Sequence, residues 1–379
     1  MAERKIVGIG MLGAGWMGRA HNNGYKTAKY MYWPKCNWDP QLITIGDISE
    51  EMGWRAAERF GYEYGVEGYE DIIKNPRVDI FDNVTPDSFH AQPSIDAALA
   101  GKHVICEKPL AVGGQEAKRM YDAVTKSGVK NMCCFSYRFL PAVRLAYELL
   151  QSGTLGKIYH FSGKYYQDHG SAVETPAEDI WYIGWSGIAQ GITSHLIDMS
   201  RFLIAEIKTV NGMSKTYNKV RNSKNGPIDV TSDEGFFSMI EFENEVSGVI
   251  QSLGVANGRR SEFSFEIYGS CGSMTWNVEE PNFLNVYLSD TVNSKVIGFT
   301  KVCATEPNHP FMDVWWPKGH TLGWEHGHIN MLAHFIDCVA NDKPVAPFAA
   351  TFEDGYRVAV IIDAINASSA QGRKLEVNF

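Results

Sequence analysis

The feature that most constrains the fold is a glycine-rich segment near the start of the chain, Gly13-Ala-Gly15-Trp-Met-Gly18. It follows the apolar run Lys5–Met11, which we expect to be a buried strand, and it opens a helical pattern over Gly13–Ala28. In this context the first glycine permits a tight turn. The second lets the backbone approach a pyrophosphate, and the third lets helix and strand pack closely. The order of strand, glycine turn and helix predicts a dinucleotide-binding βαβ unit.

The alternation of strand and helix continues over the first 130 residues. After the first strand, the runs expected to be strands are Gln41–Asp47, Asp79–Val84, His103–Cys106 and Asn131–Phe135. The helical patterns between them are Glu50–Phe60, Tyr69–Lys74, His90–Ala100 and Gly114–Lys126. Strands that alternate with helices of about 10–15 residues are typical of a parallel, doubly wound sheet. The predicted fold class is therefore α/β, beginning with a Rossmann domain.

The pattern changes after about residue 155, where runs with period-two alternation become frequent. The predicted strands are Ile158–Gln167, Thr209–Thr216, Glu234–Glu241, Val246–Leu253, Ser261–Tyr268, Ser273–Val278 and Leu284–Leu288. The predicted helices are Pro141–Gln151, His195–Leu203, Gly327–Ala340 and Phe352–Ala370. Such alternation indicates an antiparallel sheet with one face on a core.

Two domains follow from this change of pattern. We expect a cofactor-binding Rossmann domain over residues 1–135 and an α+β domain over residues 136–379. The second domain would carry a large open, mostly antiparallel sheet, and the family resemblance described below implies that this domain serves substrate binding and oligomerisation. The last helix, residues 352–370, can pack back towards the first domain.

An acidic residue closes the second predicted strand. Asp47 ends the run Ile43-Thr-Ile-Gly-Asp47, and Ile48 follows it. A carboxylate at this point accepts hydrogen bonds from the adenosine ribose hydroxyls and repels a 2′-phosphate. The sequence therefore favours NAD over NADP as the cofactor. The insertion Tyr30–Pro40 makes the spacing between helix and strand longer than usual.

Charge and cysteine content exclude several classes of protein. The chain has 35 Lys and Arg against 44 Asp and Glu, a formal net charge of −9, which gives no electrostatic reason to bind nucleic acid or an anionic membrane. No run of about 18 apolar residues predicts a membrane span, and the short, glycine-containing run near the start is a poor signal-peptide core. Seven cysteines without a C-x-x-C pair favour a reduced, cytoplasmic protein. The histidines at 320, 326, 328 and 334 lack the spacing of a known zinc set, so we predict no metal.

Further motifs lie where predicted strands end, the edge at which open α/β sheets bind ligands. They are Thr85-Pro86 with His90, Glu107-Lys108-Pro109, Tyr137-Arg138 and Ser194-His195-Leu-Ile-Asp198. Together with the glycine loop, and in this order, they resemble the glucose–fructose oxidoreductase/inositol dehydrogenase (Gfo/Idh/MocA) family over essentially the whole chain. Gly15-Trp-Met-Gly-Arg-Ala-His21, Tyr-Tyr-Gln-Asp168 and the aromatic insertion look like its levoglucosan dehydrogenase and glycoside 3-dehydrogenase branch.

The resemblance implies catalytic roles for Lys108 and His195. Oxidation of a secondary alcohol needs a base and a cation that stabilises the developing alkoxide, and a lysine buried beside a cofactor can have a lowered pKa. Family members commonly carry Asp four residues before this histidine, where Gly191 stands here. Proton transfer would then rest on Lys108 and His195 alone, or on Asp168 or His169 as a replacement.

The remaining roles also come from the resemblance. Cofactor contacts are expected from Gly13, Ala14, Gly15, Trp16, Met17, Gly18, Asp47, Ile48, Thr85, Pro86, His90, Glu107 and Lys108. Substrate contacts are expected from Tyr137, Gln167, Asp168, His169, His195, Trp324 and His326. Aromatic faces suit the C–H faces of a sugar ring, whereas polar groups read its hydroxyls.

The predicted function is NAD-dependent oxidation of a secondary hydroxyl of a pyranose or glycoside, with C3 the expected carbon and a keto sugar as product. An inositol dehydrogenase, a glycosidase that uses NAD transiently and a non-catalytic sugar or NAD sensor are the alternatives. An NADPH-dependent reductase is disfavoured by Asp47. An open sheet face suggests a homo-oligomer, a dimer, a tetramer or a larger assembly.

Overall fold

The computed structural model of the chain describes residues 4–180, 183, 186–289 and 295–379. Its contacts divide the chain into two compact units. The first comprises Met1–Leu140, Asp313–Trp316 and Gly323–Arg357, and the second comprises Pro141–Met312, Pro317–Leu322 and Val358–Phe379. The first unit thus takes in two segments that lie far beyond residue 135 in the sequence, and the division cuts the last helix between Arg357 and Val358.

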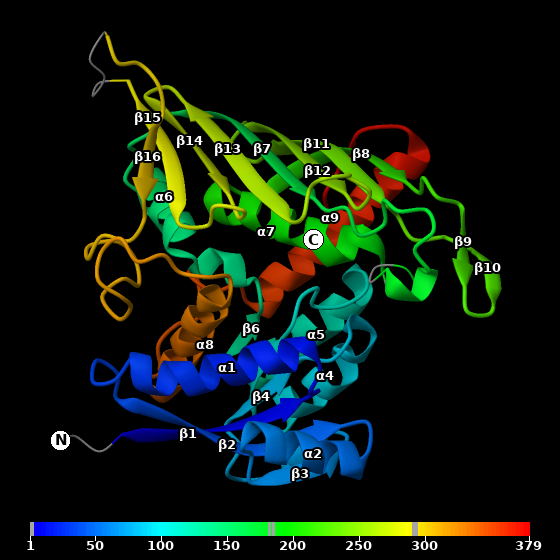
Figure 1. Cartoon of the computed structure of the whole chain (residues 1–379), viewed down its shortest axis with the longest axis vertical. Coiled ribbons are helices and arrows are strands. Elements are labelled where there is room, and N and C mark those ends of the chain that lie inside the picture. The colour runs from blue at the N-terminus through cyan, green and yellow to red at the C-terminus, as the bar shows by residue number, and fades with distance from the viewer. Residues whose placement is uncertain (1–3, 181–182, 184–185, 290–294) are drawn as a thin grey trace. The chain divides into compact units, whose positions relative to one another are not determined.

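The first unit is built on a six-stranded parallel sheet of order β3-β2-β1-β4-β5-β6 (Figure 1). The strands are β1 (Lys5–Leu12), β2 (Trp38–Asp47), β3 (Tyr64–Glu67), β4 (Ile80–Asn83), β5 (His103–Cys106) and β6 (Asn131–Cys133). The connecting helices are α1 (Trp16–Met31), α2 (Glu50–Phe60), α3 (Glu70–Lys74), α4 (Ala91–Leu99) and α5 (Gly114–Ser127). The predicted Rossmann arrangement is confirmed, with β1 buried along most of its length because helices cover both faces of a parallel sheet.

Local signals set the ends of these helices. Ser49 caps α2, where its hydroxyl accepts the N–H of Met52 at 3.3 Å. Gly61 ends the same helix in the left-handed conformation, with φ 79°, which favours glycine. Helix α8 (Glu325–Ala340) also belongs to this unit and packs on α1. A Cβ at Gly24 of α1 would lie 2.4 Å from Leu332, so this glycine permits the close approach of the two helices.

The second unit contains a nine-stranded sheet of order β16-β15-β14-β13-β7-β12-β11-β8-β17. Its strands are β7 (Ile158–Tyr166), β8 (Ile207–Lys215), β11 (Gly235–Phe242), β12 (Ser247–Leu253), β13 (Glu262–Gly269), β14 (Gly272–Asn277), β15 (Phe283–Leu288), β16 (Thr300–Cys303) and β17 (Leu375–Glu376). All neighbours pair antiparallel except β7 and β12, which confirms the predicted mostly antiparallel sheet. A separate hairpin joins β9 (Val220–Ser223) to β10 (Gly226–Asp229).

One face of the large sheet forms a core, as its alternating burial shows. Phe161, Phe242, Phe263 and Trp276 are buried there, with edge-on ring contacts between Phe161 and Phe242 and between Phe263 and Trp276. Helices of this unit are α6 (Pro141–Gln151), α7 (Ser194–Leu203) and most of α9 (Phe352–Gln371).

The sequence reading differs from the structure mainly in short or irregular elements. Strands β3, β9, β10, β16 and β17 were not expected, because two- to four-residue strands with glycine or charged residues carry little periodicity. The strand expected over Asn131–Phe135 ends at Cys133. A π-helical turn, Ala189–Thr193, leads into α7. Within the described residues, no helix is both long and apolar enough to span a bilayer.

Candidate functional site

The glycine loop between β1 and α1 has the backbone that its sequence predicts. Gly13 has φ +100°, and its N–H donates to the carbonyl of Gly46 at 2.9 Å. A Cβ at Gly18 would lie 2.7 Å from the Gly13 carbonyl oxygen, so packing explains that glycine. A Cβ at Gly15 would meet no described atom within 4 Å. The backbone at Gly15 therefore faces open space, as expected where a phosphate approaches.

The start of α1 fits a dinucleotide phosphate. Gly15 is the N-cap and supplies no side-chain hydrogen bond, and the first turn contains no acidic residue. The N–H groups of Trp16, Met17 and Gly18 are thus left without a side-chain cap, in the positive end of the helix dipole.

Asp47 lies against this loop, as the sequence predicts. One carboxylate oxygen accepts the N–H of Ala14 at 3.1 Å, and the other accepts the N–H of Ile48 at 2.8 Å. Each oxygen has further capacity to accept a hydrogen bond, so the carboxylate can still bind ribose hydroxyls. The loop, the helix start and Asp47 together fit NAD.

A stack of two tryptophans borders the glycine loop. Trp16, largely exposed, lies parallel to Trp324 with ring centroids 5.5 Å apart. Trp324 also contacts His328 of α8, at 4.1 Å between ring centroids. The sequence gives no signal for this stack, because some 300 residues separate its members, but all three belong to the first unit.

His90 connects the two loops that follow β4 and β5. Its ring nitrogens lie 2.8 Å from the carbonyl oxygens of Thr85 and Pro109. The hydroxyl of Thr85 donates to Asn83 at 2.6 Å, which further orders the loop that contains Pro86. Since the histidine is almost fully buried, these contacts give it a role in holding the loops rather than in touching a ligand.

Lys108 follows β5 and carries the perturbed amine that the chemistry needs. The residue is half-buried, and desolvation lowers the pKa of its amine, opposed by the negative charge of Glu107 and by Asp87. The backbone N–H of Lys108 donates to Glu107 at 3.1 Å. A lysine with a lowered pKa at the carboxyl edge of a parallel sheet is a candidate general base.

The sequence analysis did not predict the buried, charged histidine that contacts Glu107. His21 on α1 has one ring nitrogen 2.8 Å from Asp82 of β4 and the other 3.0 Å from Glu107. Burial would lower the pKa of His21, but the charges and hydrogen bonds of Asp82 and Glu107 outweigh it and raise the pKa to about 10. Two features of the sequence could have indicated this pair: Asp82 lies inside the apolar run of β4, and His21 follows Gly18 by one helical turn.

Among the described residues, one group has the geometry of a metal site: His21, Glu107 and Cys134, whose ligand atoms lie within 4.8 Å of one another. A metal would need a neutral imidazole and a thiolate. Both nitrogens of His21 face carboxylates and its pKa is raised, while burial raises the pKa of the Cys134 thiol well above its usual value. The cluster therefore fits an ion-pair network better than a metal.

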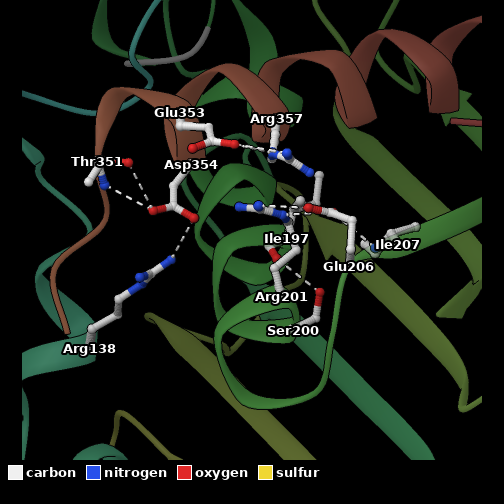
Figure 2. Close-up of polar contacts among 10 residues, drawn as sticks. All are labelled: Arg138, Ile197, Ser200, Arg201, Glu206, Ile207, Thr351, Glu353, Asp354 and Arg357. Atoms are coloured by element: carbon white, nitrogen blue, oxygen red, sulfur yellow. Dashed lines mark hydrogen bonds and ion pairs between the residues drawn. The ribbon is translucent and has the colours of Figure 1, made fainter. Parts of the chain in front are cut away.

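Tyr137 and Arg138 lie in the short 3₁₀ turn Ser136–Phe139, and both are buried. Arg138 pairs with Asp354 at 3.7 Å, and Asp354 also accepts the N–H of Thr351 at 2.9 Å (Figure 2). Arg138 therefore anchors the start of α9 and has a structural role.

Trp324 and His326 lie at the start of α8, where Trp324 is the N-cap and His326 is in the first turn. His326 accepts the N–H of Gly323 at 3.0 Å, and its ring lies 4.5 Å from that of Trp315. Burial lowers the pKa of His326. These contacts hold His326 against Gly323 and Trp315, while Trp324 keeps part of its surface open.

In the second unit, His195 lies in the first turn of α7. It is 8% exposed, and its ring centroid is 6.2 Å from those of both Tyr165 and Phe263. Gly191 lies in the π-helical turn just before this helix, and such turns are frequent at functional sites. At the other end of α7, Arg201 and Glu206 form a 2.8 Å ion pair (Figure 2).

The three polar residues after β7 have different environments. Gln167 donates to the Ser261 hydroxyl at 3.3 Å, and Asp168 pairs with Arg260 at 3.1 Å. His169 is exposed. The carboxylate of Asp168 is thus engaged by a guanidinium.

Comparison with known proteins places the chain in a family. Residues 7–135 match the oxidoreductase family with the NAD-binding Rossmann fold, and residues 143–275 match the GFO/IDH/MocA C-terminal domain. Levoglucosan dehydrogenase of Pseudarthrobacter phenanthrenivorans is 36% identical over 394 residues, 98% of each chain. The scyllo-inositol 2-dehydrogenase (NAD(+)) of Bacillus subtilis is 30% identical over 56% of this chain and 59% of its own. Glucose-6-phosphate 3-dehydrogenase of the same organism is 23% identical over 98% of both.

A solved structure agrees with these matches over the whole fold. Levoglucosan dehydrogenase in complex with NADH and levoglucosan superimposes with a TM-score of 0.92 at 34% identity, covering 99% of this chain and 100% of the other. The glycine loop, Asp47 and the Glu107-Lys108 turn thus occur in the fold that the family shares. The chain belongs to the GFO/IDH/MocA family and is an NAD-dependent oxidoreductase.

Proposed function

We propose that the protein oxidises a secondary hydroxyl of a pyranose sugar or glycoside at C3, forming a keto sugar. The observation that carries this proposal is the match to levoglucosan dehydrogenase along 98% of both chains at 36% identity. The choice of C3 draws support from the full-length match to a glucose-6-phosphate 3-dehydrogenase.

Lys108 is the proposed base. Oxidation of the alcohol breaks its C–H and O–H bonds: NAD, when bound, accepts the hydride at C4 of the nicotinamide, and a protein group must take the proton. The lowered pKa of Lys108 leaves more of its amine neutral near physiological pH, and a neutral amine can accept that proton. Once protonated, the amine returns the proton to solvent, and another turnover begins after the keto sugar leaves and NADH, which retains the hydride, is exchanged for NAD.

His195 is the proposed second polar group at the reacting hydroxyl. Gly191 has no side chain to supply a carboxylate, and Asp168 is paired with Arg260. Proton transfer in this proposal therefore rests on Lys108 and His195. Tyr137, Gln167 and Trp324 remain proposed sugar contacts. His169 and His326 are weaker candidates, because His169 is exposed and His326 packs against Gly323 and Trp315.

A screen for NADH formation tests the proposal. The substrates are levoglucosan, glucose, methyl glucosides, glucose 6-phosphate and the inositols, and NMR of the product identifies the oxidised carbon. We expect turnover of a pyranose with a ketone at C3. The 30% identity to a scyllo-inositol 2-dehydrogenase makes inositol the second candidate, and exclusive turnover of inositols would replace the proposal.

Two further outcomes would also overturn it. Release of an aglycone without net NADH, with NAD retained through purification, would indicate a glycosidase that uses NAD transiently. Tight NAD and sugar binding without turnover would indicate a sensor.

We also propose that the outer face of the large sheet mediates homo-oligomerisation. Strand register places the exposed Met213, Met239 and Tyr268 on one face, opposite the core. Exposed apolar side chains gathered on one sheet face are typical of an interface. Light scattering should give a mass that is a multiple of 42.3 kDa, and a monomer at micromolar concentration would rule this out.

A further inference from the structure

The strongest unexplained feature is the buried chain of polar contacts behind the Lys108 turn. His21 lies between two carboxylates, 2.8 Å from Asp82 and 3.0 Å from Glu107. The hydroxyl of Tyr25 donates to the same oxygen of Asp82 at 2.7 Å. The side chains of His21 and Asp82 are fully buried, and that of Glu107 is 5% exposed.

Charge balance explains why these side chains can be ionised although they are buried. A buried carboxylate is costly unless it is paired and hydrogen-bonded. A doubly protonated His21 can donate to both carboxylates at once, and its pKa of about 10 keeps it in that form at neutral pH. Although burial favours the neutral acid, the hydrogen bond and charge of His21, aided by Lys108, hold the pKa of Glu107 below its usual value.

Glu107 contacts both His21 and Lys108. One of its oxygens faces His21, and the other accepts the backbone N–H of Lys108 at 3.1 Å. The carboxylate is therefore fixed in place at both oxygens. Its negative charge raises the pKa of the Lys108 amine against the dominant effect of desolvation, which lowers it.

The other titratable groups that act on Lys108 come from three neighbouring elements. Asp87 of the 3₁₀ turn Asp87–Phe89 and Cys133 of β6 favour its charged form. His328 of α8 also interacts with Lys108 and Glu107, but burial lowers the pKa of His328 to about 4, so it is neutral in the working range. The ring centroids of His21 and His328 are 6.1 Å apart, and of these two histidines only His21 carries charge in that range.

We propose that His21 is a positioning residue, which holds Glu107 ionised and in place and thereby sets the protonation of the base Lys108. The inference rests on the proposed function, in which Lys108 takes the proton of the sugar hydroxyl. In a His21→Asn variant, Asp82 and Glu107 would face each other's charge without the cation. Glu107 would take up a proton, and Lys108 would lose the negative charge that most favours its charged form, so its pKa would fall further.

The pH profile of kcat/KM is the deciding measurement, because it reports the pKa of the base in the free enzyme. Activity rises with pH as Lys108 loses its proton, so a lower pKa in His21→Asn moves the acidic limb of the profile to lower pH. We expect a shift of about one pH unit together with an approximately tenfold lower plateau, where a merely structural loss would lower the plateau alone. Glu107→Gln should move the limb in the same direction.

Tyr25→Phe is the matched control, because it removes one hydrogen bond to Asp82 at the same depth and leaves the cation in place. Its limb should stay at the wild-type pH. An unmoved limb in folded His21→Asn overturns the proposal.

A measurement on the wild-type protein keeps the proposal testable if His21→Asn does not fold. Nitrogen-15 NMR of labelled histidine should show a ring that remains doubly protonated up to pH 8.5, and its absence overturns the inference. This readout needs no substrate. If the wild type oxidises no sugar while this ring is present, the proposed function has failed and the charged network stands without its catalytic role.

Discussion

The two candidate catalytic residues, one in each unit, have environments of different kinds. Lys108 lies next to Glu107, which pairs with a buried histidine that in turn pairs with Asp82. His195, in the first turn of α7, lies beside the stacked rings of Tyr165 and Phe263. Burial and neighbouring charges therefore act together on the protonation of Lys108, whereas aromatic rings pack against His195. Substitutions that separate charge from shape should affect the two residues differently.

The largest effect is expected from Lys108→Ala. Removal of the base should lower kcat/KM by roughly 10³-fold, while NAD binding, measured by fluorescence titration, changes little. Lys126→Ala, an exposed lysine on α5, is the control and should behave as wild type. A Lys108→Ala enzyme that binds NAD and turns over sugar normally would remove Lys108 from the mechanism.

A substitution that keeps ring volume tests the other half of the comparison. His195→Phe preserves packing against Tyr165 and Phe263 but removes both ring nitrogens. We expect kcat to fall by about 10²-fold with a thermal midpoint close to that of wild type. Full activity in this variant would show that His195 is a packing residue only.

The preference for NAD over NADP should weaken when Asp47 loses its negative charge but keeps its shape. Asp47→Asn retains an oxygen that can accept the Ala14 N–H but no longer repels a 2′-phosphate. The ratio of kcat/KM for NAD to that for NADP should fall by at least about tenfold, given a charge contribution of at least about 1.4 kcal/mol. Asp71→Asn, at an exposed acid on α3, is the control. An unchanged ratio would mean that another residue excludes NADP.

The smallest effect is expected at Asp233 of the second unit. Glu107 has the cation His21 beside it, whereas, among the described residues, the groups that act on the pKa of Asp233 include no cation. Burial raises the pKa of Asp233 to about 6, against the hydrogen bond from the Ala189 N–H at 2.8 Å. The folded state thus favours the protonated acid, and this stabilisation is lost as pH rises through about 6. Asp233→Asn should raise Tm by about 2–4 °C at pH 8 and by little at pH 5.

Calorimetry at both pH values checks this expectation. Asp229→Asn, at an exposed position on β10, should leave Tm unchanged. A lower Tm for Asp233→Asn at pH 8 would show that the hydrogen bond to Ala189 matters more than the burial of charge.

The fold was predictable where periodicity is strong. Apolar runs such as Lys5–Met11 and alternating ones such as Ser261–Tyr268 identified the two sheets, where the structure has β1 and β13. Short strands such as β9 and the π-helical turn at Ala189–Thr193 could not be predicted, because they have too few residues to show a period. The same holds for the candidate site, where local motifs could be predicted and contacts between distant segments could not. Gly13, Gly15, Gly18 and Asp47 are local motifs, whereas the Trp16–Trp324 stack joins distant segments.

The sequence alone located the glycine loop, the acid at the end of β2 and Lys108, because each depends on a few neighbouring residues at a strand end. Only the tertiary structure decided which groups control that lysine. His21, Asp82 and Glu107 come from a helix and the ends of two strands, and they meet because β1, β4 and β5 are adjacent in one parallel sheet. Burial alone would lower the pKa of His21, but the charges and hydrogen bonds of the two carboxylates act more strongly away from water and outweigh it.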